Sequence, residues 1–290
     1  MNINSREDTF FQMKNSLNCK GRILDLSTPA IMGILNLTPD SFYDGGKFEN
    51  ETSIFQTAES MLKAGVDLLD IGGQSTRPGA VRVLPDEEWN RISFTLETIH
   101  KQFPNAIISV DTFYAEVAEK AVHAGASIVN DISAGEFDKN MFPFIAKSHT
   151  PYIIMHKKGE PETMQKNPHY NDVILEVLTF FVDKVSQLKA LGVCDIVIDP
   201  GFGFGKTVLH NYALLKNLEK FKVLSCPIMA GISRKSMITK VLNVKPAEAL
   251  TGTIALNTIA LLNGASILRV HDTVQAIEVR KIIQQYMFTL

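Results

Sequence analysis

The chain has 290 residues, of which 45% are hydrophobic and 21% are charged, and its formal net charge is -2 at pH 7. This composition is typical of a globular protein with one sizeable core, and the near-neutral charge gives no global field that would attract nucleic acid. No apolar run is long enough to span a bilayer, and residues 1–11 lack the features of a signal peptide. Three cysteines without zinc-ligand spacing indicate a reducing compartment. We therefore expect a cytoplasmic protein that contacts neither membrane nor nucleic acid.

The first segment with structural signals runs from Phe10 to Leu26 and has turn residues around positions 15–18, which predicts a hairpin covering one end of the domain. Eight apolar runs of strand length follow, each succeeded by apolar residues at helical spacing. In chain order, the runs are Ile31–Leu37, Leu68–Gly73, Ile107–Thr112, Ile128–Ser133, Tyr152–His156, Asp195–Pro200, Ile228–Ser233 and Ile267–His271. Their near-continuous hydrophobicity is typical of strands that are covered on both faces.

Eight strand–helix pairs favour an α/β (β/α)8 TIM barrel over an open doubly wound sheet, which usually has five or six strands. The clearest helix places Ile174, Val177 and Phe181 on one face and ends before Gly192. Gly65 and Gly125 are predicted to end two earlier helices in the same way. Because no linker divides the chain, we expect a single domain over residues 1–290, with an N-terminal extension at 1–26 and the barrel at 27–290.

The stretch from Ala247 to Leu262 is apolar on more than one face. A helix that packs only on a barrel needs one apolar stripe, so the second stripe indicates a further buried surface. Two interpretations stay open here: the surface belongs to a homodimer, or the terminal helices of the same chain cover it.

Polar residues gather at the predicted strand ends, where barrels of this type build their active sites. They are Asn36, Asp70, Asp111, Asn130, Asp131, His156, Asp199, Ser233, Arg234, Lys235, Arg269, His271 and Asp272. Carboxylates such as Asp111 and Asp199 are costly in a narrow mouth unless they bind donors or cations, which predicts a ligand rich in N–H groups. Salt bridges to Lys235 or Arg269 are the structural alternative. For His156, a neutral ring that is hydrogen-bonded in the loop is the simpler interpretation.

The loops after the last two strands form the usual phosphate site of this fold, and here they carry Gly231–Ser236 and Arg269–Asp272. Cationic side chains beside a helix start predict an anion such as phosphate, whereas a solvated cationic patch is the alternative. The glycine-rich run Asp199–Thr207 lacks the spacing of a nucleotide-binding loop, so we interpret it as a small-residue loop beside a flat ligand, with Phe202 and Phe204 as apolar walls. No metal-ligand spacing or nucleophile motif is present in the sequence, which argues against a metal cage and covalent catalysis.

In these positions the chain resembles the dihydropteroate synthase family over nearly its whole length. The resemblance is carried by eight ordered blocks: Met32–Gly46, Asp70–Ala80, Ser109–Thr112, Asn130–Ser133, Met155–His156 with Thr163–Gln165, Asp199–Lys206, Ser233–Ser236 and Arg269–Asp272. It implies an enzyme of folate biosynthesis that condenses 6-hydroxymethyl-7,8-dihydropterin diphosphate with p-aminobenzoate and releases diphosphate by an SN1-like path.

By the same resemblance, Asp199 accepts two parallel hydrogen bonds from the pterin ring, and Mg2+ bridges the diphosphate to Asn36. The pterin residues implied are Asp111, Asn130, Ile132, Met155, Asp199, Gly231 and Lys235, and the diphosphate residues are Asn36, Arg269 and His271. The p-aminobenzoate residues implied are Phe42, Thr76, Arg77, Phe204 and Ser236. The catalytic residues implied are Asp111, Asp199, Lys235, Arg269, Asp44 and Arg77.

The sequence departs from the family pattern at Gln74, where Glu is common, at Tyr43, where Ser is usual, and at Lys157–Lys158, where Met-Arg is common. These departures affect the electrostatics of the loops and leave the expected pterin pocket intact. Two other functions share that pocket: a methyltetrahydrofolate-dependent methyltransferase and a non-catalytic pterin carrier. The cluster at Ser233–Ser236, Arg269 and His271 favours the synthase over the methyltransferase, which holds no diphosphate. Release of diphosphate would distinguish the synthase from a carrier.

Overall fold

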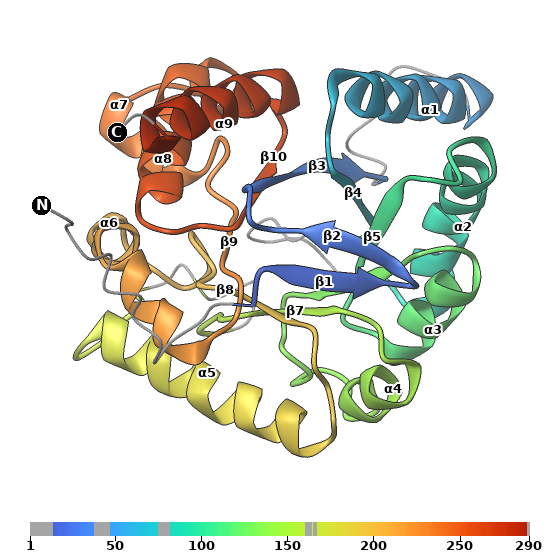
Figure 1. The fold of residues 1–290 in the computed structure, drawn as a ribbon, viewed down its shortest axis with the longest axis horizontal. Helices are drawn as coiled ribbons and strands as arrows, with labels where there is room; N and C mark the ends of the chain where they lie inside the picture. Colours follow the sequence, from blue (N-terminus) through green and yellow to red (C-terminus); the bar gives the residue numbers. More distant parts are fainter. Residues whose placement is uncertain (1–13, 38–46, 75–81, 160–163, 165–166, 289–290) are drawn as a thin grey trace, which may run out of the picture.

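A computed structural model describes residues 14–37, 47–74, 82–159, 164 and 167–288. Its main sheet has eight parallel strands in the order β8-β7-β6-β5-β4-β3-β10-β9, and Figure 1 shows them surrounded by helices. The strands are β3 (Ala30–Asn36), β4 (Leu68–Gly72), β5 (Ile107–Asp111), β6 (Ile128–Asp131), β7 (Tyr152–Met155), β8 (Ile196–Asp199), β9 (Met229–Ala230) and β10 (Ile267–Val270). All eight predicted strands are present, and the prediction of a (β/α)8 barrel is confirmed.

The barrel closes between its first and last strands, because β10 pairs in parallel with both β3 and β9. Between β8 and β9 the connection is a single bridge from Ile198 to Ile228, so the barrel is nearly rather than fully closed there. The predicted strand Ile228–Ser233 is longer than β9, which has 2 residues. Its last residues turn instead toward the following helix, because Ile232 accepts a hydrogen bond from the backbone N–H of Lys235 (3.1 Å).

Helices follow the strands and cover the outside of the barrel (Figure 1). They are α1 (Lys47–Ala64), α2 (Pro85–Gln102), α3 (Ala115–His123), α4 (Met141–Ser148), α5 (Val173–Ala190), α6 (Val208–Lys216), α7 (Ser236–Leu242), α8 (Leu250–Leu262) and α9 (Thr273–Phe288), with short 3-10 helices at Leu218–Leu224 and Pro246–Glu248. Gly65, Gly125 and Gly192 follow helix ends with φ of 98°, 123° and 83°, as the sequence predicts. None of the helices in the described part of the chain is long and apolar enough to cross a membrane.

The predicted N-terminal hairpin consists of β1 (Ser16–Cys19) and β2 (Arg22–Asp25), and it crosses the centre of the barrel in Figure 1. Its Leu17, Cys19 and Leu24 side chains are buried in one cluster with residues from the starts of the barrel strands. The hairpin therefore closes the amino-terminal end of the barrel, which we call the bottom. Residues 10–13 of the predicted segment lie outside the described residues.

Side chains inside the barrel change from apolar at the bottom to polar above it. The bottom layer on the strands is Ala30, Met32, Leu68, Ile107, Ile128, Ile153, Val197, Met229 and Ile267. Side chains alternate along a strand, so the residues two positions later also point inward. Counted from Met32 on β3 and from the bottom-layer residue of each other strand, the residues two positions later are Ile34, Asp70, Ser109, Asn130, Met155, Asp199, Gly231 and Arg269. The second layer therefore places several polar and charged groups below the carboxyl end of the barrel, which we call the mouth.

Candidate active site

The strand register joins three predicted site residues in one continuous run of paired residues at the mouth. Asn36 on β3 pairs with Gly72 on β4, Gly72 pairs with Asp111 on β5, and Asp111 pairs with Asn130 on β6. Farther around the barrel, Asp199 at the end of β8 pairs with Met155 on β7. Predicted site residues from five different strands, β3, β5, β6, β7 and β8, thus meet at the mouth because parallel strands all end at the same rim.

Arg269 links two carboxylates across the mouth. Its Nε lies 2.6 Å from Oδ2 of Asp70, and its Nη2 lies 2.7 Å from Oδ2 of Asp111. Burial raises the pKa of Asp111, Arg269 opposes that rise, and the nearby Asp70 and Glu88 add to it. The salt bridge left open for Asp111 by the sequence therefore exists. A guanidinium has five N–H donors, and these two contacts use only part of them, so Arg269 keeps donors for an anionic ligand.

Asp70 also belongs to this network, although the sequence predicts only its position at a strand end and no role for it. Its side chain is fully buried, and its Oδ2 also accepts a hydrogen bond from Nδ2 of Asn130 (3.0 Å). Its Oδ1 has no hydrogen-bond partner among the described residues. The sequence does contain a signal for this role: Asp70 is a single carboxylate within the apolar run Leu68–Gly72, at an inward position of the strand.

The side chains of Asp199, Lys235 and Arg269 lie around Gly231. A Cβ at Gly231 would be 3.6 Å from Nζ of Lys235, 3.7 Å from Oδ2 of Asp199 and 3.9 Å from Cβ of Arg269. The Oδ1 of Asp199 accepts the N–H of Gly201 at 2.8 Å. Burial raises the pKa of Asp199, while Lys235, that hydrogen bond and Arg269 counter the rise. The carboxylate and the basic groups therefore lie close enough to act on one bound molecule.

Lys235 precedes α7 and turns back into the mouth. Its Nζ donates a hydrogen bond to the carbonyl of Phe202 (2.7 Å) and lies 4.8 Å from the centre of the Phe204 ring. Burial lowers the pKa of Lys235 to about 8, which the attraction of Asp199 partly offsets. The predicted residue Ser236 is the exposed first residue of α7.

A small apolar cluster forms one wall of the mouth. It contains the buried residues Phe113, Ile132 and Met155, with Phe204 and Phe137 packed against them. Flat aromatic and aliphatic surfaces beside a few convergent polar groups are the usual lining of a small-molecule site. The structure thus brings together three predicted site residues, Ile132, Met155 and Phe204.

The predicted anion residues lie on neighbouring strands. The ring Nδ1 and the backbone N–H of His271 each lie 3.3 Å from Oγ of Ser233. Burial, with the nearby Arg269 and Arg234, lowers the pKa of His271 to about 4, so the ring is neutral at pH 7. Arg234 itself points to Asp272, and its Nε lies 3.0 Å from Oδ2 of that residue. Asn36 ends β3 and is partly exposed.

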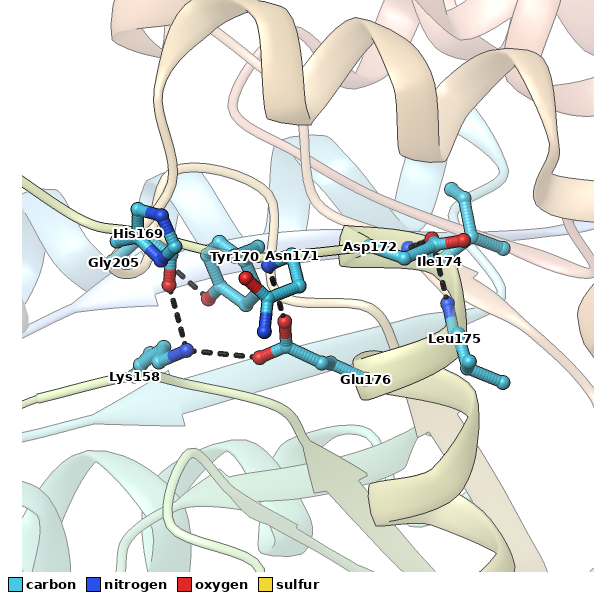
Figure 2. Close-up of polar contacts among 9 residues, drawn as sticks. All are labelled: Lys158, His169, Tyr170, Asn171, Asp172, Ile174, Leu175, Glu176 and Gly205. Atoms are coloured by element: carbon cyan, nitrogen blue, oxygen red, sulfur yellow. Dashed lines mark hydrogen bonds and ion pairs between the residues drawn. The ribbon is translucent and has the colours of Figure 1, made fainter.

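The loop between β8 and α6 is fastened to the loop between β7 and α5, as Figure 2 shows. The hydroxyl of Tyr170 donates to the carbonyl of Gly205 (2.9 Å). Nζ of Lys158 donates to the carbonyl of His169 (2.7 Å), pairs with Glu176 (2.9 Å) and lies 4.2 Å from the centre of the Tyr170 ring. The departure at Lys158 therefore supplies a contact that joins the loop to α5.

The departure at Gln74 also has a physical explanation. Its Nε2 donates to Oε2 of the buried Glu88 (3.3 Å), and its Oε1 accepts the N–H of Val83 (2.9 Å). Burial raises the pKa of Glu88 to about 7, and hydrogen bonds from Thr112 and Gln74 counter this rise. An amide at position 74 can donate to a carboxylate, which an ionised Glu could not do.

Four of the predicted site residues are not placed by the structure: Phe42, Asp44, Thr76 and Arg77 lie outside the described residues. The neighbouring departure at Tyr43 lies outside them as well. The described residues include no group of three or more His, Cys, Asp and Glu side chains that could hold a metal ion. His156 is buried, and burial with the nearby Lys206 and Lys158 lowers its pKa to about 2. Its ring is thus neutral, but Nδ1 has no hydrogen-bond partner in the described part of the chain.

Comparisons with known proteins agree with this geometry. A family model described as pterin binding enzyme matches residues 32–271. The dihydropteroate synthase of Escherichia coli (strain K12) is 41% identical over 270 residues, which are 92% of this chain and 95% of that protein. The structure of Yersinia pestis dihydropteroate synthase with a sulfonamide drug complex has a TM-score of 0.89 at 40% identity, covering 94% of this chain and 100% of that one. The structure of Xanthomonas albilineans dihydropteroate synthase with 4-aminobenzoic acid has a TM-score of 0.89 at 37% identity, covering 95% and 99% of the two chains.

Proposed function

The chain belongs to the dihydropteroate synthase family, and we propose that it condenses 6-hydroxymethyl-7,8-dihydropterin diphosphate with p-aminobenzoate to form 7,8-dihydropteroate and diphosphate. It is a transferase of folate biosynthesis. The observation that carries the proposal is the convergence of Asp199, Lys235 and Arg269 around Gly231. A carboxylate suits the N–H groups of a pterin ring, and the cations beside it suit an anion attached to that ring.

The pterin ring would lie in the second inward layer. Asp199 would accept hydrogen bonds from the ring amide and its exocyclic amine, while Asn130, Asp111 and Lys235 would serve the other polar edges. Ile132 and Met155, which pack together in one cluster, would contact the ring from the side. Because Gly231 has no side chain, the ring could approach the backbone at this position.

The main catalytic task is to neutralise the departing diphosphate. Arg269 keeps unused donors while Asp70 and Asp111 hold two of its nitrogens, and His271 lies two residues later on the same rim. When the C–O bond to diphosphate breaks, positive charge develops on the exocyclic carbon and spreads into the ring. Asp111 and Asp199 would stabilise that charge electrostatically, which supports an SN1-like path. The aromatic amine is neutral at pH 7, so it would attack the carbon without a strong general base and then lose a proton.

Asn36 is the residue that would hold Mg2+. It offers one neutral amide oxygen at the end of β3, and oxygen donors suit this ion. A donor set this small fits an ion that keeps several waters and is bound mainly by substrate phosphates. The bound ion would supply charge neutralisation for the leaving group.

The second substrate would lie nearer the surface of the mouth. Phe204 would contact the p-aminobenzoate ring, and Ser236 would bind its carboxylate. Phe42, Thr76 and Arg77, with Asp44, would complete this part of the site and exclude water, since water could otherwise capture the cation.

A homodimer through α8 and α9 is a further part of the proposal. Ile259 and Leu262 on α8 are 40% and 47% exposed, and Ile282 and Tyr286 on α9 are 68% and 67% exposed. The two helices pack against each other, so these side chains belong to neighbouring elements. Burial of such apolar surface favours association. Sedimentation at increasing concentration should give a dimer mass, and a monomer at all concentrations would contradict this part. We also propose a cytoplasmic location, as the composition of the sequence leads us to expect.

The test of the proposed reaction is direct. Purified protein is mixed with Mg2+, the dihydropterin diphosphate and p-aminobenzoate, and dihydropteroate is sought by mass while diphosphate release is followed. Dihydropterin without the diphosphate serves as the matched control substrate. The proposal predicts equal amounts of dihydropteroate and diphosphate, and only with the diphosphate ester. Binding of both ligands without turnover would instead identify a carrier, and turnover that requires a methyl donor would identify a methyltransferase.

A further inference from the structure

Lys206 is a buried lysine that the reaction described above does not use. Its side chain is 2% exposed, and no carboxylate of the described residues forms a salt bridge with it. Burying an ammonium costs several kcal/mol unless its donors are satisfied. All three donors of Lys206 have acceptors, because Nζ donates to the carbonyls of Gly201 (2.9 Å), Phe204 (3.0 Å) and His156 (3.2 Å).

These three carbonyls fix the course of the loop between β8 and α6. Gly201 and Phe204 lie on the turn between β8 and α6, where the N–H of Phe204 also donates to the carbonyl of Gly201 (3.1 Å). His156 follows β7 and donates its backbone N–H to the carbonyl of Asp199 (3.0 Å). One ammonium group therefore joins the end of β7 to both sides of the turn that carries Phe204.

Close backbone contacts show how tightly this loop is packed. A Cβ at Gly201 would lie 1.9 Å from the carbonyl oxygen of His156, and a Cβ at Gly205 would lie 2.1 Å from that of Lys158. Both glycines also have positive φ, 70° and 64°. At the end of the loop nearer α6, the Tyr170 hydroxyl donates to the carbonyl of Gly205, as Figure 2 shows. The loop thus has two buried attachments, one at Lys206 and one at Tyr170.

The loop matters because its Phe204 side chain faces the site. Phe204 packs against Phe113, Ile132 and Met155, and its ring lies 4.8 Å from Nζ of Lys235. A binding site loses affinity when its contact side chains are not held within about 0.5 Å of their working positions.

We propose that Lys206 is a positioning residue, which holds the β8–α6 loop in the shape that presents Phe204 to the aromatic amine substrate. This inference rests on the proposed function, since it concerns the amine subsite of that reaction. An apolar residue of equal length would fill the same space without the cost of burying a charge. The ammonium is therefore explained by its three hydrogen bonds to the loop rather than by packing.

The test compares Lys206→Met with Lys216→Met, which makes the same chemical change at an exposed position on α6. For Lys206→Met, the KM for p-aminobenzoate should rise about tenfold while kcat changes less than about threefold. Titration calorimetry should give an unchanged affinity for the pterin. A KM for p-aminobenzoate that matches the Lys216 variant would overturn the inference, and so would a loss of pterin affinity that equals the loss of amine affinity.

A pH profile adds a readout that simple packing would not change. Burial lowers the pKa of Lys206 to about 7, Asp199 opposes this and Lys235 adds to it. His156 and His210 also face Lys206 from the two flanking elements. The neutral amine has two donors for three carbonyls, so the KM for p-aminobenzoate of the wild-type protein should rise as the pH passes about 7, and that of Lys206→Met should not. Equal profiles for the two proteins would contradict the inference.

Failure of the proposed function and failure of the inference on Lys206 give different results. If the wild-type protein makes no dihydropteroate, the proposed function fails, and Lys206 is not the cause. If Lys206→Met does not fold, Tyr170→Phe acts on the same loop through the carbonyl of Gly205, and the KM for p-aminobenzoate should rise about threefold. An unchanged KM for p-aminobenzoate in this variant would then overturn the inference.

Discussion

The bottom and the mouth of the barrel are built on the same strands but have opposite chemistry. At the bottom, the hairpin residues Leu17 and Leu24 pack with apolar strand residues. Only two positions farther along the strands, Asp70 and Asp199 are buried beside Arg269. Apolar burial stabilises the fold, whereas buried charges cost stability unless they are paired or bind a ligand. The bottom therefore contributes to the stability of the barrel, and the charges of the mouth are explained by what they bind.

The largest effect is expected at the bottom. Leu17→Ala removes a fully buried side chain of the hairpin and should lower the free energy of unfolding by about 3 kcal/mol, because the cavity left behind is only partly filled. Urea denaturation measures this change. The affinity of the folded protein for the pterin should not change. Ile23→Ala, on the same hairpin but 64% exposed, is the control. Equal losses of stability in the two variants would argue against the hairpin as a structural plug.

The next effect concerns turnover. Arg269→Ala removes the cation that faces the leaving group, so diphosphate release should slow by about 10²-fold or more. Arg280→Ala is the matched change near the bottom, where Arg280 contacts Asp67 and lies 3.3 Å from the carbonyl oxygen of Pro29. That variant should lose stability and keep its turnover per folded molecule. Similar rates for the two arginine variants would remove Arg269 from the reaction.

A smaller effect separates the two ends of β8. Asp199→Asn should weaken pterin binding by about tenfold or more, because an amide cannot accept both hydrogen bonds from the ring. Asp195→Asn, just before the same strand, affects contacts far from the mouth: the salt bridge of Asp195 to Lys14 (2.5 Å) and the hydrogen bond that it accepts from the backbone N–H of Asn18 (3.4 Å). Titration calorimetry with the pterin should detect no change for that variant. Unchanged affinity in Asp199→Asn would contradict the assigned pocket.

The smallest effect is a pH dependence of stability. Burial is the main reason why the pKa of His156 falls from its ordinary value of 6.5 to about 2 in the folded protein, so only the unfolded chain binds a proton as the pH drops below 6.5. The wild-type protein should therefore lose about 1 kcal/mol more than His156→Gln between pH 7 and pH 5.5. Chemical denaturation at both pH values measures the difference, and exposed His123→Gln serves as the control. A parallel decline in wild type and His156→Gln would show that His156 does not contribute.

The sequence predicts the barrel and its hairpin well because both depend on apolar runs and their spacing. Each predicted strand corresponds to an observed one, although β9 is much shorter than Ile228–Ser233. The predicted positions of Asp111, Asn130 and Asp199 at strand ends agree with the structure for the same reason. The pairing of Asp70 with Arg269 joins residues far apart in the chain. It could have been found by counting inward positions along both strands.

The loops are less predictable from the sequence. The three carbonyl contacts of Lys206 depend on the shape of an irregular segment that has no period to analyse. The glycine-rich run Asp199–Thr207 predicts a loop of small residues but not which groups that loop contacts. The roles of Phe42, Asp44, Thr76 and Arg77 stay predictions, because these residues lie outside the described part of the chain. The role of Asn36 in Mg2+ binding is likewise still a prediction.

The central claim is that the second inward layer of the barrel holds one molecule by its ring and by its anion at the same time. A crystal structure of the protein with bound 6-hydroxymethyl-7,8-dihydropterin diphosphate tests this most directly. We expect hydrogen bonds from the pterin ring to Asp199 and contacts from the diphosphate to Arg269. A ligand bound elsewhere, or one that touches Arg269 while its ring lies away from Asp199, would contradict it.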